Sequence, residues 1–206
     1  MIEAIIMAGI NLKRRGFNPV IEIMHPLVAH ENELKILKDM TLKVAQEVMK
    51  REGVEIKYLI GTMIEVPRAA LCADKIAKYA EFFSFGTNDL TQTTYAFSRD
   101  DVEASFLPFY IDKKILPENP FMVLDIEGVG KLVEIGTKLG KESNPQLEVG
   151  ICGEHGGEPA SVKFFHKAGL DYVSCSPFRI PIARLSAAQA VVEEKFAKKE
   201  AYSDSR

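Results

Sequence analysis

The chain has 206 residues, of which 47% are hydrophobic and 27% charged, an ordinary composition for a globular protein. Its formal net charge of −3 provides no basic field that would hold nucleic acid or an anionic membrane. No apolar run approaches the roughly 18 residues of a membrane span, and the 3 cysteines lack framework spacing, which indicates reduced thiols in a cytoplasmic protein.

Short apolar runs alternate with amphipathic stretches along the chain, and this rhythm predicts strands followed by helices. The predicted strands are residues 20–24, 57–62, 82–85, 147–152 and 172–175. The predicted helices are residues 2–16, 32–51, 67–79, about 89 onward, 127–139, 160–168 and 182–199. Between residues 97 and 147, repeated proline breaks indicate an irregular excursion of a functional or partner-binding kind. We assign residues 1–200 to one domain and residues 201–206 to a polar tail.

Strands that alternate with helices predict a parallel α/β fold. The rhythm alone does not distinguish an open doubly wound sheet from a closed barrel. A complete eight-unit barrel usually takes roughly 250 residues, so a barrel built from this chain would lack about three units. The open strand edges of such a barrel would favour a homodimer or other self-association.

Polar residues with possible chemical roles follow three of the predicted strands. Glu65 follows the second strand, Asn88 and Asp89 follow the third, and Cys152 ends the fourth. In parallel α/β folds the carboxyl ends of the strands form the site, so we expect these side chains to lie close together. Two carboxylates that leave room for substrate oxygens and waters suit Mg²⁺. The alternative is that each acid merely caps the helix after it.

Cys152 opens a glycine-rich turn that continues through residues 153–157 (Gly-Glu-His-Gly-Gly). Glycine in such a turn lets the backbone approach a ligand closely. The thiol could act there as a nucleophile or as a proton donor, and the alternative is an inert buried cysteine. His155 could act as a base or could simply hydrogen-bond the turn.

Four motifs carry a family resemblance. They are residues 61–71 (Gly-Thr-Met-Ile-Glu-Val-Pro-Arg-Ala-Ala-Leu), 83–92 (Phe-Ser-Phe-Gly-Thr-Asn-Asp-Leu-Thr-Gln), 150–157 (Gly-Ile-Cys-Gly-Glu-His-Gly-Gly) and 172–185 (Tyr-Val-Ser-Cys-Ser-Pro-Phe-Arg-Ile-Pro-Ile-Ala-Arg-Leu). In this order they closely resemble the C-terminal domain of the pyruvate, phosphate dikinase family of phosphoenolpyruvate (PEP)-utilising enzymes. PEP synthases and the first enzyme of the sugar phosphotransferase system share the Asn-Asp-Leu-Thr-Gln core. The glycine-rich turn and the Ser-Cys-Ser-Pro-Phe-Arg ending are most similar to the dikinases, and the resemblance runs from about residue 1 to residue 192.

The resemblance implies a (β/α)₈ TIM barrel that binds pyruvate or PEP together with Mg²⁺. Glu65 and Asp89 match the family's metal ligands, which also belong to the substrate-binding site. Gly86, Thr87 and Asn88 match the turn that contacts the substrate.

The resemblance also implies roles in proton transfer. Cys152 matches the acid that protonates the enolate carbon of pyruvate, or that takes a proton from the methyl group in reverse. Ser84 and Tyr172, at neighbouring strand ends, would orient this thiol beside the substrate.

The chain also departs from the family pattern. Its strands match the last five of the barrel, so the first three units and their two phosphate-gripping arginines are not expected in it. The phosphohistidine domain and the ATP-binding domain are not expected either. We therefore expect a C-terminal fragment that interconverts pyruvate and PEP only with phosphohistidine supplied from elsewhere, and that is inactive alone in the full reaction. The alternatives are a non-catalytic fragment that serves assembly and a PEP synthase-like enzyme.

Overall fold

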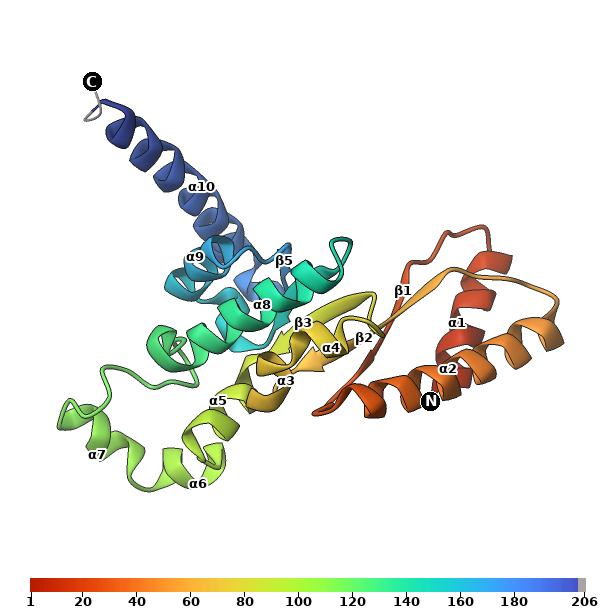
Figure 1. Cartoon of the computed structure of the whole chain (residues 1–206), viewed down its shortest axis with the longest axis horizontal. Coiled ribbons are helices and arrows are strands. Elements are labelled where there is room, and N and C mark those ends of the chain that lie inside the picture. The colour runs from red at the N-terminus through yellow and green to blue at the C-terminus, as the bar shows by residue number, and fades with distance from the viewer. Residues whose placement is uncertain (204–206) are drawn as a thin grey trace.

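The computed structural model describes the backbone of residues 1–203 and the side chains of residues 1–196 (Figure 1). Its strands form one parallel sheet in the spatial order β1-β2-β3-β4-β5. They are β1 (Ile21–His25), β2 (Tyr58–Ile64), β3 (Phe82–Gly86), β4 (Glu148–Cys152) and β5 (Tyr172–Val173). A doubly wound sheet reverses its strand order at a switch point, whereas a TIM barrel follows the chain order. The fold is therefore of the TIM-barrel type, as the resemblance implies, and the barrel is incomplete.

The helices of the described residues flank this sheet. They are α1 (Ile2–Arg14), α2 (Glu31–Glu52), α3 (Pro67–Leu71), α4 (Ala73–Ile76), α5 (Thr87–Tyr95), α6 (Arg99–Ala104), α7 (Leu107–Asp112), α8 (Lys131–Ser143), α9 (Pro159–Lys167) and α10 (Ile180–Ser203). Right-handed crossovers between parallel strands place the connecting helices on one face of the sheet. Figure 1 shows α3, α4 and α8 gathered over β2 and β3.

Alternation along the strands divides the sheet into an outward face, which meets the helices, and an inward face. Most outward side chains are apolar, and seven of them are at most 3% exposed: Ile23, Ile60, Ile64, Phe83, Phe85, Val149 and Ile151. On the inward face, the register aligns Met63, Ser84, Gly150 and Tyr172 in one row and Gly86 with Cys152 in the next. This inward face would line the interior of a closed barrel.

Helices α1 and α2 pack together against the outward face of β1. Ile6 and Ile10 are completely buried beside Ile23 and Val48. Gly9 permits this packing, because a Cβ at Gly9 would lie 2.8 Å from Cδ1 of Ile56 and still closer to Ile21.

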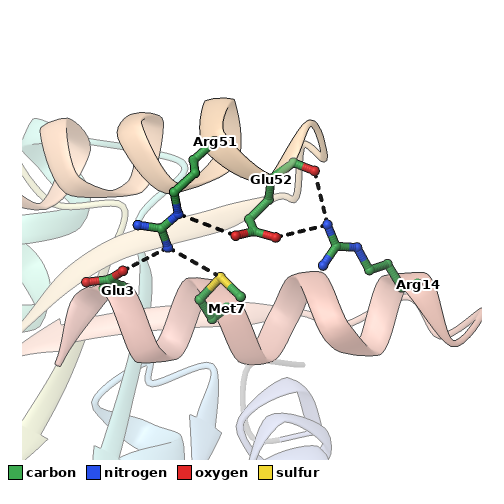
Figure 2. Close-up of polar contacts among 5 residues, drawn as sticks. All are labelled: Glu3, Met7, Arg14, Arg51 and Glu52. Atoms are coloured by element: carbon green, nitrogen blue, oxygen red, sulfur yellow. Dashed lines mark hydrogen bonds and ion pairs between the residues drawn. The ribbon is translucent and has the colours of Figure 1, made fainter.

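Exposed charged side chains form ion pairs between α1 and α2 (Figure 2). Arg51 Nη2 lies 2.8 Å from Glu3 Oε1 and 3.8 Å from the sulfur of Met7. Arg14 Nη2 lies 3.0 Å from Glu52 Oε2. Because exposed ion pairs each contribute only about 0–1 kcal/mol, the buried isoleucines dominate the stability of this pair of helices.

The predicted single helix over residues 67–79 is wrong. Cys72 has a non-helical φ of −119°, and it separates α3 from α4. The chain bends there so that Ala69 and Ala70 on one side and Ala73 and Ile76 on the other are all buried in the main core.

The predicted strand over residues 172–175 is also too long, since β5 spans only Tyr172–Val173. The Ser174 N–H still donates to the Ile151 carbonyl at 2.8 Å, so the chain stays beside β4 for one more residue. A short 3₁₀ turn at Pro177–Arg179 then leads into α10.

The predicted excursion after residue 97 is partly ordered into α6 and α7. It has a small core of its own, in which Val102, Leu107 and Phe121 are buried. It ends in a π-helical turn at Ile126–Gly130, which the side chain of Asp125 caps by accepting from the N–H groups of residues 128 and 129. The helix predicted over 127–139 thus begins as a π turn and runs on as α8 to Ser143.

Helix α10 extends away from the sheet (Figure 1). Ile182, Leu185 and Val192 on this helix are 46%, 61% and 50% exposed. Among the described residues, no helix is long and apolar enough to cross a membrane. The predicted polar tail, residues 201–206, overlaps the end of α10, and residues 204–206 lie outside the described residues.

Candidate active site

Glu65 and Asp89 form a pair of carboxylates at the carboxyl ends of β2 and β3. Glu65 follows β2 and is 2% exposed, and its Oε1 accepts a hydrogen bond from the Leu27 N–H at 2.6 Å. Burial raises the pKa of Glu65, the Leu27 N–H opposes that rise, and the neighbouring Asp89 carboxylate adds to it. A cation beside the pair would remove this mutual repulsion.

The contacts of the two acids contradict the alternative that they cap helices. Helix α3 has Val66 at its N-cap and receives no side-chain cap, because the Glu65 carboxylate is turned towards Leu27. Helix α5 begins after Gly86 and likewise has no side-chain cap, although Asp89 lies in its first turn. Both carboxylates are therefore available for another role.

Asp89 is held by the residue that ends the Asn-Asp-Leu-Thr-Gln motif. Gln92 Nε2 donates to Asp89 Oδ1 at 2.9 Å. The other end of the same amide, Oε1, accepts from the Arg99 N–H at 2.9 Å, at the first residue of α6. The excursion thus contributes to the orientation of Asp89, and sequence reasoning missed both Gln92 and Leu27 as supporting residues.

The predicted substrate turn, Gly86 to Asn88, lies between the carboxylates and the glycine-rich turn. A Cβ at Gly86 would collide with Glu65 Oε2, so only glycine allows this close approach. Asn88 Oδ1 is buried and has no hydrogen-bond partner among the described residues. An orphaned buried acceptor beside two carboxylates is the kind of group that a bound ligand or hydrated ion satisfies.

Cys152 ends β4 in register with Gly86, which places it on the inward face at the level of the substrate turn. Its Sγ lies 3.8 Å from the Phe85 carbonyl, an arrangement in which the S–H donates. Tyr172 lies one row below, and its ring covers Gly150, where a Cβ would collide with it. Burial raises the pKa of Tyr172, and a hydrogen bond from Ser84 opposes the rise. The structure thus brings Cys152, Ser84 and Tyr172 together on one face.

His155 is completely buried and hydrogen-bonds at both ring nitrogens. Nε2 lies 3.0 Å from the Pro120 carbonyl, which can only accept, and Nδ1 lies 2.7 Å from Thr87 Oγ1. The neutral ring therefore donates from Nε2 and accepts the Thr87 hydroxyl proton at Nδ1. Of the two roles considered for His155, the geometry favours the one that holds the turn, because no ring nitrogen is left to act as a base.

A cavity of about 330 Å³ borders the substrate turn on its other side. Its lining residues are Asn88, Gly153, Glu154, Ser174, Cys175, Ser176 and Arg179. Sequence reasoning singled out Asn88 and, as part of the glycine-rich turn, Gly153 and Glu154, but it gave the other lining residues no role. The Ser-Cys-Ser-Pro-Phe-Arg segment after β5 was the available signal.

The donor set fits a magnesium ion. The described residues contain no group of three or more His, Cys, Asp and Glu side chains that could hold a metal. Mg²⁺ is commonly bound by one or two carboxylates while it keeps several waters and substrate oxygens, so Glu65 and Asp89 suffice for it.

Comparison with known proteins bears on these residues directly. The family model described as "PEP-utilising enzyme, PEP-binding domain" matches residues 3–192. The chain belongs to the PEP-utilising enzymes.

Among the PEP-utilising enzymes, the chain is similar to curated pyruvate, phosphate dikinases. Pyruvate, phosphate dikinase of Clostridium symbiosum is 57% identical over 194 residues, which cover 94% of this chain and 22% of the relative. Chloroplastic pyruvate, phosphate dikinase 1 of Arabidopsis thaliana is 58% identical over 190 residues, or 92% of this chain and 20% of the relative. The chain thus spans about a fifth of the length of the relatives it matches.

Solved structures support the fold of this PEP-utilising chain. RipC from Yersinia pestis aligns with a TM-score of 0.51 at 12% identity, over 87% of this chain and 71% of that one. A citrate lyase from Burkholderia xenovorans aligns with a TM-score of 0.52 at 13% identity, over 88% and 55%. At such identities the likeness concerns the fold alone.

Proposed function

We propose that this chain is the C-terminal part of a pyruvate, phosphate dikinase and carries the metal-binding and proton-transfer half of its pyruvate site. The observation that supports this most is the shared position of three groups. Glu65, Asp89 and Cys152 all lie at the carboxyl ends of adjacent strands, and the two carboxylates are close enough to perturb each other. The dikinase relatives, at 57–58% identity, favour this enzyme over a PEP synthase.

In this proposal Glu65 and Asp89 hold Mg²⁺, and the turn from Gly86 to Asn88 contacts pyruvate or PEP. The ion, when bound, supplies positive charge beside the oxygen on which the enolate charge develops. Leu27 and Gln92 fix the two carboxylates in advance, so that little rearrangement accompanies binding.

Cys152 is the proposed proton donor. Its S–H proton passes to the methylene carbon of the enolate, a C–H bond forms, and the sulfur keeps the electron pair as a thiolate. In the reverse direction the thiolate takes a proton from the pyruvate methyl group. Tyr172 and Ser84, on the same face, orient the thiol beside that carbon.

The phosphoryl group comes from a phosphohistidine on another domain, and an ATP-binding domain charges that histidine. Neither is proposed to lie in this chain, so the isolated chain would not complete the full reaction. The second candidate is a non-catalytic piece that serves assembly. The open edges of the sheet favour it, because β1 and β5 each have one neighbouring strand among the described residues.

Exchange of pyruvate methyl protons with deuterated solvent tests the proposal. We expect Mg²⁺-dependent exchange, followed by NMR, that Cys152→Ala lowers at least about tenfold, within the range for loss of a general acid–base group. Cys72→Ala is the matched control, because Cys72 lies between α3 and α4 and should leave exchange unchanged.

Exchange that survives Cys152→Ala unchanged would exclude Cys152 as the acid. If calorimetry shows that the parent chain binds both pyruvate and Mg²⁺ but no exchange occurs, the assembly role would be favoured.

A further inference from the structure

The loop between β1 and α2 contains a residue in an unusual backbone conformation. Leu27 has a φ of 55°, in the left-handed region that a leucine rarely adopts. Such a conformation persists only where the surrounding structure holds it. The Leu27 side chain is 60% exposed, so its own packing does not hold the loop.

The conformation of Leu27 determines where its N–H points. This N–H donates to Glu65 Oε1 at 2.6 Å. Relaxation of φ at Leu27 to an ordinary negative value would turn the peptide group and move the N–H away from the carboxylate. The contacts that hold the loop therefore also hold the Glu65 side chain.

Some of these contacts come from α2. Glu33 Oε2 on this helix accepts from the N–H groups of Ala29 and His30, at 2.9 Å and 2.8 Å. Val28 is 2% exposed and lies in the main core. These contacts fix the loop at the end where it enters α2.

Arg68 holds the loop from the other side. It lies on α3, which begins two residues after Glu65, and its Nη1 donates to the Ala29 carbonyl. The contacts form a closed ring, because the Glu65 side chain accepts from the loop and the helix after Glu65 donates to the same loop. Within the described residues Arg68 belongs to none of the ion pairs, so its guanidinium is free to serve this carbonyl.

We propose that Arg68 is a positioning residue for Glu65. By holding the Ala29 carbonyl, Arg68 keeps Leu27 in the left-handed conformation that aims its N–H at the carboxylate. This inference rests on the proposed function, in which Glu65 holds Mg²⁺. The alternative is an ordinary solvated charge on the surface of α3, since Arg68 is exposed.

Substitution of Arg68 in the full chain tests this role through metal affinity. Arg68→Met should weaken Mg²⁺ binding, measured by calorimetry, about tenfold, at the lower end of the range for losing a group that orients a metal ligand. Arg68→Lys keeps a charged donor and should recover most of that loss. Lys75→Met is the matched control and should bind Mg²⁺ as the parent does, because it removes an equal charge from an exposed position of α4.

A glycine at position 27 separates positioning from general stability. Glycine adopts a positive φ without strain, so Leu27→Gly can keep the N–H in place without help from Arg68. The double variant Arg68→Met/Leu27→Gly should therefore bind Mg²⁺ more tightly than Arg68→Met alone. A residue that merely stabilises α3 would give no such rescue.

Hydrogen exchange of the amide at position 27 is a second readout, and it needs no metal. Exchange followed by NMR should be slow in the parent, at least about tenfold faster in Arg68→Met, and slow again in the double variant. If the parent chain does not bind Mg²⁺, the proposed metal site fails, and the amide still decides the role of Arg68.

Two results would overturn the inference. One is an Arg68→Met variant that matches Lys75→Met in metal affinity and in amide exchange. The other is a double variant that behaves like Arg68→Met, because Arg68 would then not act through the conformation of Leu27.

Discussion

Replacing His155 with glutamine should lower the unfolding free energy of the chain, because it breaks one of two buried hydrogen bonds. The ring joins the Thr87 hydroxyl at 2.7 Å and the Pro120 carbonyl at 3.0 Å, and it is completely buried. A glutamine amide cannot reach both partners from one position. One buried polar group is then left unsatisfied, which costs about 1–3 kcal/mol of unfolding free energy.

The same substitution should change how stability depends on pH. Burial lowers the pKa of His155 below its ordinary value of 6.5. The contribution of the neutral ring to the unfolding free energy is therefore fully present above pH 6.5. It is lost as the pH falls towards the lowered pKa of the folded state. Between the two values the loss is at most about 1.4 kcal/mol per pH unit, and His155→Gln should remove it.

Urea unfolding between pH 7.5 and pH 5 measures both effects. His25 must be treated separately, because burial lowers its pKa as well; His25→Gln is the control that isolates its share. The reasoning would be refuted if His155→Gln kept the parent's full loss of stability on acidification. A decrease of less than about 0.5 kcal/mol at pH 7.5 would equally contradict the two buried hydrogen bonds.

Two further predictions concern the inward face. Burial and Asp89 raise the pKa of Glu65, so its ionised form destabilises the folded chain at neutral pH. The unfolding free energy therefore decreases as the pH rises through the raised pKa. Glu65→Gln should therefore be no less stable than the parent at pH 7.5, yet thermal unfolding should show no stabilisation by Mg²⁺; a preserved magnesium shift would remove Glu65 as a ligand. Gly150→Ala should lower the unfolding free energy by about 1–3 kcal/mol, since the new Cβ collides with the Tyr172 ring, and Ala160→Ser on α9 serves as a mild surface comparison.

The strand pattern was predictable because it depends on local sequence. The runs at 82–85 and 147–152 are rich in apolar residues and are bounded by polar or glycine residues, and the observed β3 and β4 agree with them to within one residue. The break at Cys72 was not predictable in this way. It follows from packing four residues of two short helices into one core, and periodicity does not report that.

The candidate site divides in the same manner. Its principal residues, such as Asp89 and Cys152, stand in motifs that can be read along the chain. Their supports depend on contacts between distant positions. Leu27 reaches Glu65 across 38 residues of sequence, and His155 reaches Thr87 across 68. A glutamine three residues after an aspartate gave a local hint of the Gln92 contact, but its second bond, to Arg99, depends on the fold of the excursion.

The hydrogen bonds that hold the two carboxylates have a consequence for how the affinities of two ligands depend on each other. Glu65 is held by the backbone at Leu27, and Asp89 is held through Gln92, so both supports lie within the described residues. The geometry of the carboxylate pair is then already set while the sheet is open. In the proposed function, affinity for the divalent ion and affinity for an anionic substrate are therefore separable quantities, because the first depends on the two carboxylates that Leu27 and Gln92 already hold in place.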